Sequence, residues 1–363
     1  MTNSPRIRVL INGLHAKSGG GVTYLRNILP HFAADERISW HLLLGENQLK
    51  LFPDLDPRVT LHALDVPVGM KGLLVWEQLR LPRLAKEWGI DVTFSPANYG
   101  PLFAPNPVIL LRNALAVGEE DRRWDKRIYW AVLSAVTWLS LKTAKKIIAV
   151  SAYTREALAK NQGQKVKVIH HGVSEDFSTA SAALSAPPYL LAVGDLYIQK
   201  NLHRLIAAFA IIKDQFPELS LKLAGRPIDA DYASRLKNDV AKLDLGEKVE
   251  FLGGVNFETL RELYRNCAVF VFPSTVETFG NPLVEAMACG AVIASSNRTA
   301  MPEILADAGL YFNPDDSAEM AGILSRLLTD MDLRNKLKAK ALIRAQDFSW
   351  AKTAKLTADI LLK

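Results

Sequence analysis

Short apolar runs alternate with longer amphipathic segments along the whole chain. The first half offers candidate strands at residues 7–11, 41–44, 92–94, 108–111, 147–150 and 166–169. The second half offers further ones at residues 189–193, 219–223, 249–252, 269–272 and 292–295. Strands that are apolar almost throughout, with helix-length segments between them, are typical of parallel sheets buried on both faces. The pattern therefore predicts an α/β protein built from doubly wound parallel sheets.

The strand pattern starts afresh near residue 188, after a run of small residues that ends in two prolines. This run, residues 178–188, is the best candidate for a linker. With 363 residues, the chain is about twice as long as a typical domain. We therefore expect two Rossmann-like domains, at residues 1–177 and 189–347. A ligand would then lie in a deep cleft between them, at the carboxyl ends of the strands.

The composition indicates an ordinary globular protein and argues against a metal site. Hydrophobic residues make up 49% and charged residues 23%, which argues against a disordered, collagen-like or disulfide-stapled chain. The two cysteines, Cys267 and Cys289, are too few for a metal cage, and His170 and His171 have no acidic cluster at metal-ligand spacing beside them. We therefore expect no metal site. The first residues lack the apolar core of a signal peptide, which favours a cytoplasmic protein.

Positive charge is concentrated in the first half of the chain. Residues 1–180 contain 23 Lys and Arg against 16 Asp and Glu, whereas the remainder contains 21 against 22. Such a surface attracts an anionic membrane, a phosphorylated lipid or nucleic acid, although a solubilising surface without a partner explains it equally well. No basic-aromatic motif supports a nucleic-acid partner. Residues 128–141, which hold Trp130 and Trp138 between basic flanks, fit either an interfacial helix or a helix buried on the sheet.

Residues 273–290 carry the strongest chemical signal. They follow an apolar strand and contain Glu277 and Glu285, separated by a turn that includes Gly280. Pro282 suits the first turn of a helix, because its missing N–H would have no partner there. The free amides at such a helix start favour an anion, and a diphosphate fits. We expect Glu285 to lie in the first turn, where the helix dipole keeps it ionised and able to accept two hydrogen bonds from a ribose diol.

This spacing of two glutamates resembles the retaining, nucleotide-sugar-dependent glycosyltransferases of family 4 (glycosyl transferases group 1), which have the GT-B fold. The resemblance covers nearly the whole chain, and segments at residues 249–255, 263–274 and 301–304 follow in the expected order. It implies that Glu285 binds the donor ribose and that Glu277 contacts the donor sugar at the reacting centre. It also implies that the sugar and phosphate are held by intervening amides, at Phe279, Gly280, Asn281 and Leu283.

Two further stretches complete the expected donor site. Lys200 follows a strand that ends at Gly194, where it can neutralise charge on a departing diphosphate during catalysis. The resemblance leads us to expect an arginine directly after this glycine, but the chain has Asp195 there. Arg226, after the next strand, is a candidate for the second cation. The glycines around Gly20 either approach the donor phosphate or cap a helix, and their spacing does not match a dinucleotide fingerprint.

The acceptor side is less defined. Members of the family often carry a histidine after the fifth strand of the first domain, where this chain has Arg112 and Asn113. Either residue is a candidate for positioning the substrate, unless the acceptor is bound differently. His15, in the loop before the glycines, is another candidate, although a lone loop histidine is more often a local hydrogen-bonding residue. His170 and His171, near the end of the first domain, are expected to be structural.

The resemblance implies a hexosyltransferase-type enzyme that moves a sugar from a nucleoside-diphosphate sugar to a saccharide or glycolipid acceptor. It implies retention of the anomeric configuration and no metal or other cofactor. Residues 348–363 would form a helix, capped by Ser349, that crosses back to the first domain. The basic first half suggests a bacterial polysaccharide or lipopolysaccharide acceptor and peripheral association with the inner face of an anionic cell membrane. A GT-B sugar-nucleotide epimerase and a non-catalytic partner subunit are the alternatives.

Overall fold

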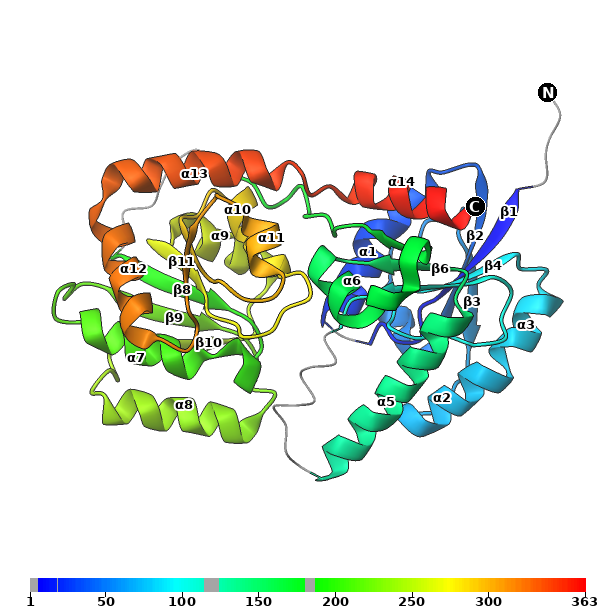
Figure 1. The fold of residues 1–363 in the computed structure, drawn as a ribbon, viewed down its shortest axis with the longest axis horizontal. Helices are drawn as coiled ribbons and strands as arrows, with labels where there is room; N and C mark the ends of the chain where they lie inside the picture. The colour runs from blue at the N-terminus through cyan, green and yellow to red at the C-terminus, as the bar shows by residue number, and fades with distance from the viewer. Residues whose placement is uncertain (1–5, 18, 114–123, 180–186) are drawn as a thin grey trace. The chain divides into compact units, whose positions relative to one another are not determined.

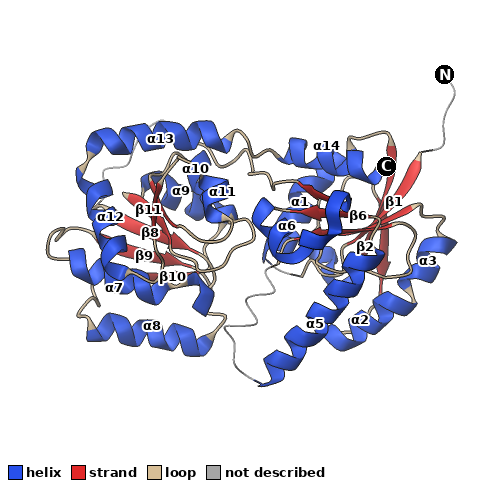
Figure 2. Ribbon diagram, viewed as in Figure 1, coloured by secondary structure: helices blue, strands red, loops and turns tan. Residues whose placement is uncertain are grey.

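The computed structural model describes residues 6–17, 19–113, 124–179 and 187–363, and it divides into two compact units (Figure 1). The first unit comprises Met1–Gly172 together with Ser349–Lys363, and the second comprises Val173–Phe348. Each unit is built on a parallel sheet flanked by helices (Figure 2), so the predicted class of two doubly wound α/β sheets is confirmed. Residues 180–186 of the predicted linker lie outside the described residues. The predicted boundary at residue 177 therefore stays a prediction.

The described part of the first unit has a seven-stranded sheet in the order β3-β2-β1-β4-β5-β6-β7. Its strands are β1 Ile7–Asn12, β2 Ile38–Gly45, β3 Thr60–Leu64, β4 Val92–Ser95, β5 Pro107–Leu111, β6 Lys146–Ala149 and β7 Val166–Val168. All neighbouring strands run parallel. Val9 of β1 lies opposite Trp40 of β2 on one side and Val92 of β4 on the other, so β1 is an interior strand of the sheet.

Helices cover this sheet and bury its apolar side chains. They are α1 Gly19–Ala33, α2 Met70–Leu79, α3 Leu81–Glu87, α5 Trp124–Thr143, α6 Ala152–Ala159 and α14 Trp350–Leu361, with 3-10 segments η1 Glu46–Leu51 and η2 Lys160–Lys165. Leu73 of α2 and Leu81 of α3 pack in one cluster with Leu10 of β1. α14 packs on α1. Its N-cap is Ser349, whose hydroxyl accepts a hydrogen bond from a first-turn amide.

The described part of the second unit has a six-stranded sheet in the order β10-β9-β8-β11-β12-β13. Its strands are β8 Tyr189–Val193, β9 Ser220–Ala224, β10 Val249–Gly253, β11 Val269–Phe272, β12 Ile293–Ser296 and β13 Leu310–Phe312. Its helices are α7 Leu202–Ile212, α8 Ala230–Lys242, α9 Phe257–Asn266, α10 Asn281–Ala288, α11 Met301–Leu305, α12 Ser317–Thr329 and α13 Met331–Ala345, with the 3-10 segment η3 Ile198–Lys200. Figure 1 shows α7 and α8 on one side of this sheet and α9, α10 and α11 on the other.

The predicted strands match the observed ones except at their ends, and those at residues 189–193 and 269–272 coincide with β8 and β11. The sequence pattern missed β3 and β13. β3 lies at the edge of its sheet and its first two residues are exposed, so its polar positions hide the strand. β13 has only three residues, too few for a periodic signal.

Both sheets contain a topological switch point. In the first unit the chain moves from β1 outwards through β2 to β3 and then returns to β4, on the other side of β1. In the second unit it moves from β8 through β9 to β10 and returns to β11, beside β8. Ligands of such sheets bind outside the carboxyl ends of the strands at this point. The loops after β1 and β4, and those after β8 and β11, are therefore where sites are expected.

Candidate functional site

An ion pair occupies the switch point of the second sheet. Lys200, at the end of η3 after β8, donates a hydrogen bond from Nζ to Glu277 Oε1, after β11, over 2.6 Å. The two side chains are only 19% and 17% exposed. A Cβ on Gly194 would come within 3.0 Å of Lys200 Cε, so this glycine leaves the space in which the lysine side chain lies. The structure thus brings together three of the predicted donor-site residues.

Three hydrogen bonds hold the loops that carry this ion pair. Asn201 directly follows the lysine in the left-handed conformation, with φ of 56°, and is buried. Its side-chain amide donates to Pro273 O over 3.1 Å and to Pro314 O over 2.8 Å. Thr275 N donates to Gln199 O over 2.9 Å. The loop after β8 is therefore tied to the loop after β11, which fixes the positions of the cation and the carboxylate.

The turn before α10 has the form expected from the sequence. Gly280 is its N-cap with φ of +88°, a conformation that favours glycine. Pro282 lies in the first turn, and Gly290 follows the helix with φ of +71°. Phe279 is 3% exposed and its ring packs on Phe348 with centroids 5.7 Å apart. Leu283 is fully buried, and its backbone N–H donates to Gly280 O over 2.9 Å.

Glu285 differs from the expectation. α10 begins at Asn281, so this glutamate lies beyond the first turn, and the prediction that the dipole keeps it ionised is wrong. Burial raises the pKa of Glu285 to about 7, while the hydrogen bond from the buried Tyr264 hydroxyl, 2.9 Å from Oε2, acts to lower the pKa. Desolvation outweighs the dipole here, because the helix field is strongest on groups in the first turn. The carboxyl is thus divided between its neutral and charged forms near pH 7.

Arg226 and Asp195 form a second ion pair in the same unit. Arg226 Nη2 donates to Asp195 Oδ2 over 2.6 Å, while its Nε and backbone N–H donate to Oδ1 over 3.1 and 3.0 Å. Partial burial acts to raise the pKa of Asp195, but the bonds from Arg226, and the charges of Arg226 and Lys200, hold it below its ordinary value. The aspartate that stands where the resemblance expects an arginine therefore binds an arginine from the next βα loop.

The predicted acceptor residues all lie in the first unit. Asn98, which is buried, accepts from the backbone N–H groups of Arg112 and Asn113 over 2.9 and 3.0 Å and donates to Asn113 O over 2.7 Å. Arg112 lies against α1, where a Cβ on Gly21 would be 2.6 Å from Nη2, and burial lowers the pKa of this arginine. Gly20 is exposed at the start of α1, with nothing within 4 Å of a Cβ built on it.

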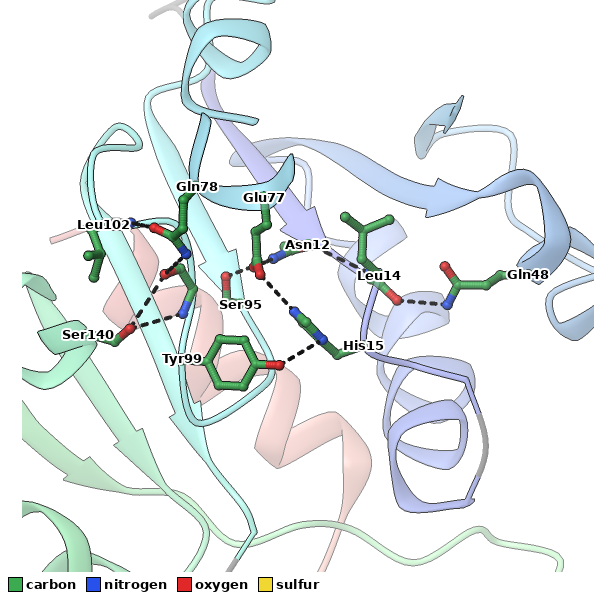
Figure 3. A network of polar contacts seen from close by, with 12 residues as sticks. Asn12, Leu14, His15, Gln48, Glu77, Gln78, Ser95, Tyr99, Leu102 and Ser140 are labelled. Carbon is green, nitrogen blue, oxygen red and sulfur yellow. Dashed lines mark hydrogen bonds and ion pairs between the residues drawn. The ribbon is translucent and has the colours of Figure 1, made fainter. Parts of the chain in front are cut away.

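His15 takes part in a network of polar side chains after β1 and β4 (Figure 3). Its ring lies between Glu77 of α2, at 3.1 Å, and Tyr99, at 3.3 Å. His171, predicted to be structural, stacks on Trp350 with ring centroids 5.6 Å apart. Within the described ranges, no three His, Cys, Asp or Glu residues gather closely enough to hold a metal ion. Nor does any helix of those ranges have the length and apolar character needed to span a membrane.

Sequence reasoning missed four residues that build these sites, namely Asn98, Asn201, Tyr264 and Glu77. Asn201 has a local signal, because asparagine tolerates the left-handed conformation that ends η3. Tyr264 and Glu77 have none, since their partners lie 21 and 62 positions away along the chain.

Comparisons with known proteins match the two halves of the chain to two family models. A family model described as Glycosyltransferase Family 4 matches residues 18–177, and one described as Glycosyl transferases group 1 matches residues 173–344. The O-antigen chain mannosyltransferase RfbU of Salmonella typhimurium is 34% identical over 182 residues, 49% of this chain and 49% of that protein. The serotype-specific mannosyltransferase WbdA of Escherichia coli is 29% identical over 198 residues, 54% of this chain and 24% of that protein. The chain thus spans half or less of the length of these curated relatives.

Solved structures resemble the chain over almost its full length. The crystal structure of WaaG, a glycosyltransferase involved in lipopolysaccharide biosynthesis, has a TM-score of 0.77 at 17% identity and covers 97% of this chain and 99% of that one. The crystal structure of Anabaena HepE in complex with UDP-glucose has a TM-score of 0.78 at 21% identity. It covers 98% of this chain and 100% of that one. At these identities the likeness shows the fold alone, which is the GT-B fold predicted from the resemblance.

Proposed function

Since the chain belongs to glycosyltransferase family 4, a retaining family, we propose that it moves a sugar from a nucleoside-diphosphate sugar to a saccharide or lipid-linked acceptor. The observation that carries this proposal is the ion pair between Lys200 and Glu277 at the switch point of the second sheet. A sugar diphosphate needs a cation for its phosphates and an acceptor for its sugar hydroxyls, and this pair supplies both.

The second unit binds the donor in this proposal. The backbone amides around Gly280 and Asn281, at the start of α10, hold the diphosphate, and the buried Phe279 and Leu283 fix the turn on either side of them. Glu285 accepts hydrogen bonds from the ribose diol. This assignment is supported by the glycine–proline turn before α10 and by the partial exposure of Asn281 and Glu285.

Donor binding exchanges the partners of Lys200. Its ammonium group turns from Glu277 to the diphosphate, and the carboxylate released in this way accepts hydroxyls of the donor sugar. Each buried charge then keeps an opposite charge or a hydrogen-bond donor, so the exchange avoids the cost of an unpaired charge. Arg226, which is half-exposed and held by Asp195, supplies the second cation.

Transfer then needs little covalent help from the protein. The acceptor oxygen bonds to the anomeric carbon on the face from which the diphosphate departs, and the bond from that carbon to the phosphate oxygen breaks. The proton of the acceptor hydroxyl passes to the departing phosphate oxygen. The protein contributes orientation and charge stabilisation. No metal or other cofactor takes part in this scheme.

The first unit takes the acceptor. Arg112 and Asn113 follow β5 and His15 follows β1, at the carboxyl edge of the first sheet. Bacterial surface polysaccharide or lipopolysaccharide is the proposed product. The two curated relatives named above support it, because one is an O-antigen chain mannosyltransferase and the other a serotype-specific mannosyltransferase.

The described part of α5 supports peripheral association with an anionic membrane. Ser140 and Leu141 are buried on one face of this helix. On the other face Val132, Trp138 and Leu139 are 42%, 55% and 40% exposed. Lys142 Nζ lies 3.6 Å from the centroid of the Trp138 ring. An aromatic ring beside a lysine on an exposed apolar face suits the headgroup region of a bilayer. One face of the helix thus packs and the other remains for lipid.

A thermal-shift screen of the purified protein tests the proposal. UDP, GDP, ADP, CMP and their common sugar conjugates are added without metal, and the melting temperature is recorded. Selective stabilisation by one nucleoside diphosphate and its sugar conjugate is expected, because a ligand that binds only the native state raises the melting temperature. Analysis of the products formed from the donor that binds then separates the alternatives. An isomerised donor without released nucleoside diphosphate would favour the epimerase. Stabilisation by none of these ligands would contradict the proposal and favour a non-catalytic partner subunit.

A further inference from the structure

The switch point of the first sheet holds a polar network around a fully buried carboxyl group (Figure 3). Glu77 extends from α2 and its side chain has 0% exposure. Asn12, the last residue of β1, donates from Nδ2 to Glu77 Oε1 over 2.5 Å and also contacts Ser95 Oγ, at the end of β4, over 3.3 Å. His15 Nε2 lies 3.1 Å from Glu77 Oε2.

The network reaches the surface through two rings. His15 is 15% exposed, and its Nδ1 lies 3.3 Å from the hydroxyl of Tyr99, in the loop after β4. The two rings meet edge to face, with centroids 4.8 Å apart. When the imidazole N–H at Nε2 donates to Glu77, Nδ1 accepts from the tyrosine hydroxyl. Hydrogen bonds then run in one direction, from Tyr99 through His15 to Glu77.

Hydrogen bonds hold both loops of this network in place. Gln48 donates from Nε2 to the carbonyl oxygens of Gly13 and Ala16, on either side of His15, over 3.1 and 2.8 Å. Gln78 donates to Gly100 O over 3.1 Å, directly after Tyr99. The two rings therefore have little freedom, which is the arrangement required of a pre-organised site.

The location of the network points to a ligand. It lies after β1 and β4, the switch point of the first sheet, as Lys200 and Glu277 lie after β8 and β11 in the second. A buried carboxyl also costs stability, and well-packed apolar residues would hold two loops at least as firmly. The Glu77 carboxyl orients the imidazole of His15 through a hydrogen bond, and an apolar residue could not do this.

We propose that Tyr99, His15 and Glu77 form a hydroxyl-binding site for the saccharide acceptor. The oxygen of Tyr99, polarised by the two bonds behind it, accepts a hydrogen bond from a sugar hydroxyl. His15 and Glu77 are positioning residues that fix the direction of the tyrosine hydroxyl. This inference rests on the proposed function, because it names the contacts that the acceptor makes.

Binding of simple glycosides to the full chain tests the inference. The methyl α-glycosides of mannose, glucose and galactose are titrated to about 100 mM, a range suited to weak affinity, and followed by ligand-observed NMR. We expect at least one to bind, and Tyr99→Phe to weaken it about tenfold, the value of one lost hydrogen bond. Glu77→Gln should weaken it similarly. Ser140→Ala, which removes a contact to Gly100 but leaves the three residues intact, is the matched control.

A second measurement separates positioning from loop stability. Nitrogen-15 spectra of the His15 ring report which nitrogen carries hydrogen, and we expect Nε2–H in the wild type and in Ser140→Ala but an altered tautomer balance in Glu77→Gln. Equal glycoside affinity in the wild type and Tyr99→Phe would overturn the inference, and so would no binding of any glycoside. Tyr99→Phe keeps the test valid if Glu77→Gln fails to fold.

The donor provides an independent check. Stabilisation by the nucleoside diphosphate found in the thermal-shift screen should be the same in all these variants, since its proposed ligands belong to the second unit. A protein that binds this nucleotide but no glycoside would refute the hydroxyl site and leave the donor proposal standing. A protein that binds no nucleotide would refute the proposed function itself.

Discussion

At the scale of single residues, the charge of Glu285 depends on its surroundings more than on its place in a helix. Burial raises its pKa to about 7, and the Tyr264 hydroxyl opposes this effect. A neutral carboxyl accepts fewer strong hydrogen bonds than a carboxylate, so its ionisation should be coupled to ribose binding.

The first prediction concerns the pH dependence of nucleotide affinity. As the pH rises from 6 to 8 through the pKa of Glu285, its carboxylate forms and the affinity for the nucleoside diphosphate should rise roughly tenfold. Calorimetric titration at these pH values measures the change. In Glu285→Gln the affinity should be lower, with only the pH dependence of the nucleotide phosphate remaining. The same rise in this variant would contradict the prediction.

A pair of histidines provides a second case at this scale. His41 Nδ1 lies 3.0 Å from His62 Nε2, and the His62 ring stacks on Trp88 with centroids 3.8 Å apart. Burial lowers the pKa of His62 to about 4 and also lowers that of His41, which Arg8 lowers further. The folded protein thus holds both rings neutral where the unfolded chain, with a pKa near 6.5, binds protons.

The second prediction follows from this difference. The contribution of His62 to stability is present above about pH 6.5 and is lost as the pH falls towards 4. Since the residue is partly exposed, we expect His62→Phe to reduce the loss of unfolding free energy between pH 7 and 5 by about 1 kcal/mol. Urea unfolding at both pH values measures it. His31→Gln, at an exposed site on α1, is the control, and an equal change in both variants would argue against the histidine pair.

At the scale of elements, α14 is a helix from the end of the chain that completes the first unit. Trp350 is 6% exposed and its ring packs on Tyr24 and His171, each with centroids 5.6 Å away. Gly172 permits this approach, because a Cβ there would be 2.1 Å from Trp350 N. The helix is therefore held by its aromatic first residue and by a close backbone contact.

The third prediction is that Trp350→Ala lowers the free energy of unfolding of the first unit by about 3–5 kcal/mol, through lost burial and the cavity left behind. Urea unfolding followed by circular dichroism measures the shift in midpoint. Lys352→Ala, an exposed position on the same helix, should change the midpoint little. If both variants unfold alike, α14 does not stabilise the unit through this ring.

At the scale of the whole molecule, charge is unevenly distributed along the chain. The excess of Lys and Arg lies in residues 1–180, and the exposed face of α5 belongs to the same part of the sequence. Electrostatic attraction and shallow insertion of an aromatic ring reinforce each other at an anionic bilayer.

The fourth prediction is that the protein floats with phosphatidylglycerol vesicles more than with phosphatidylcholine vesicles. Trp138→Ala should lower the bound fraction roughly fivefold, the equivalent of about 1 kcal/mol. Ile211→Ala removes a similarly exposed apolar side chain, 59% exposed on α7 of the second unit, and should have no effect. Equal flotation with both kinds of vesicle would contradict the proposed association with an anionic membrane.

Much of the fold could be predicted because buried parallel strands are nearly continuous apolar runs. Val269–Phe272 and Tyr189–Val193 are strands of this kind, and their bounds follow directly from the pattern. The strand β3 was not predicted, because an edge strand with exposed polar positions lacks that pattern. The ionisation of Glu285 was predicted wrongly because sequence position indicates neither the true start of α10 nor the depth of burial.

The sequence by itself determined the two parallel sheets and the glycine–proline turn before α10. These features depend on short-range chemistry: apolar periodicity, the φ freedom of glycine and the missing N–H of proline. Only the tertiary structure decided that Asp195 binds Arg226, that Tyr264 reaches Glu285 and that His15 lies between Glu77 and Tyr99. Such pairs join residues far apart in the chain, because the order of strands in a sheet, not their order in the sequence, determines which loops meet.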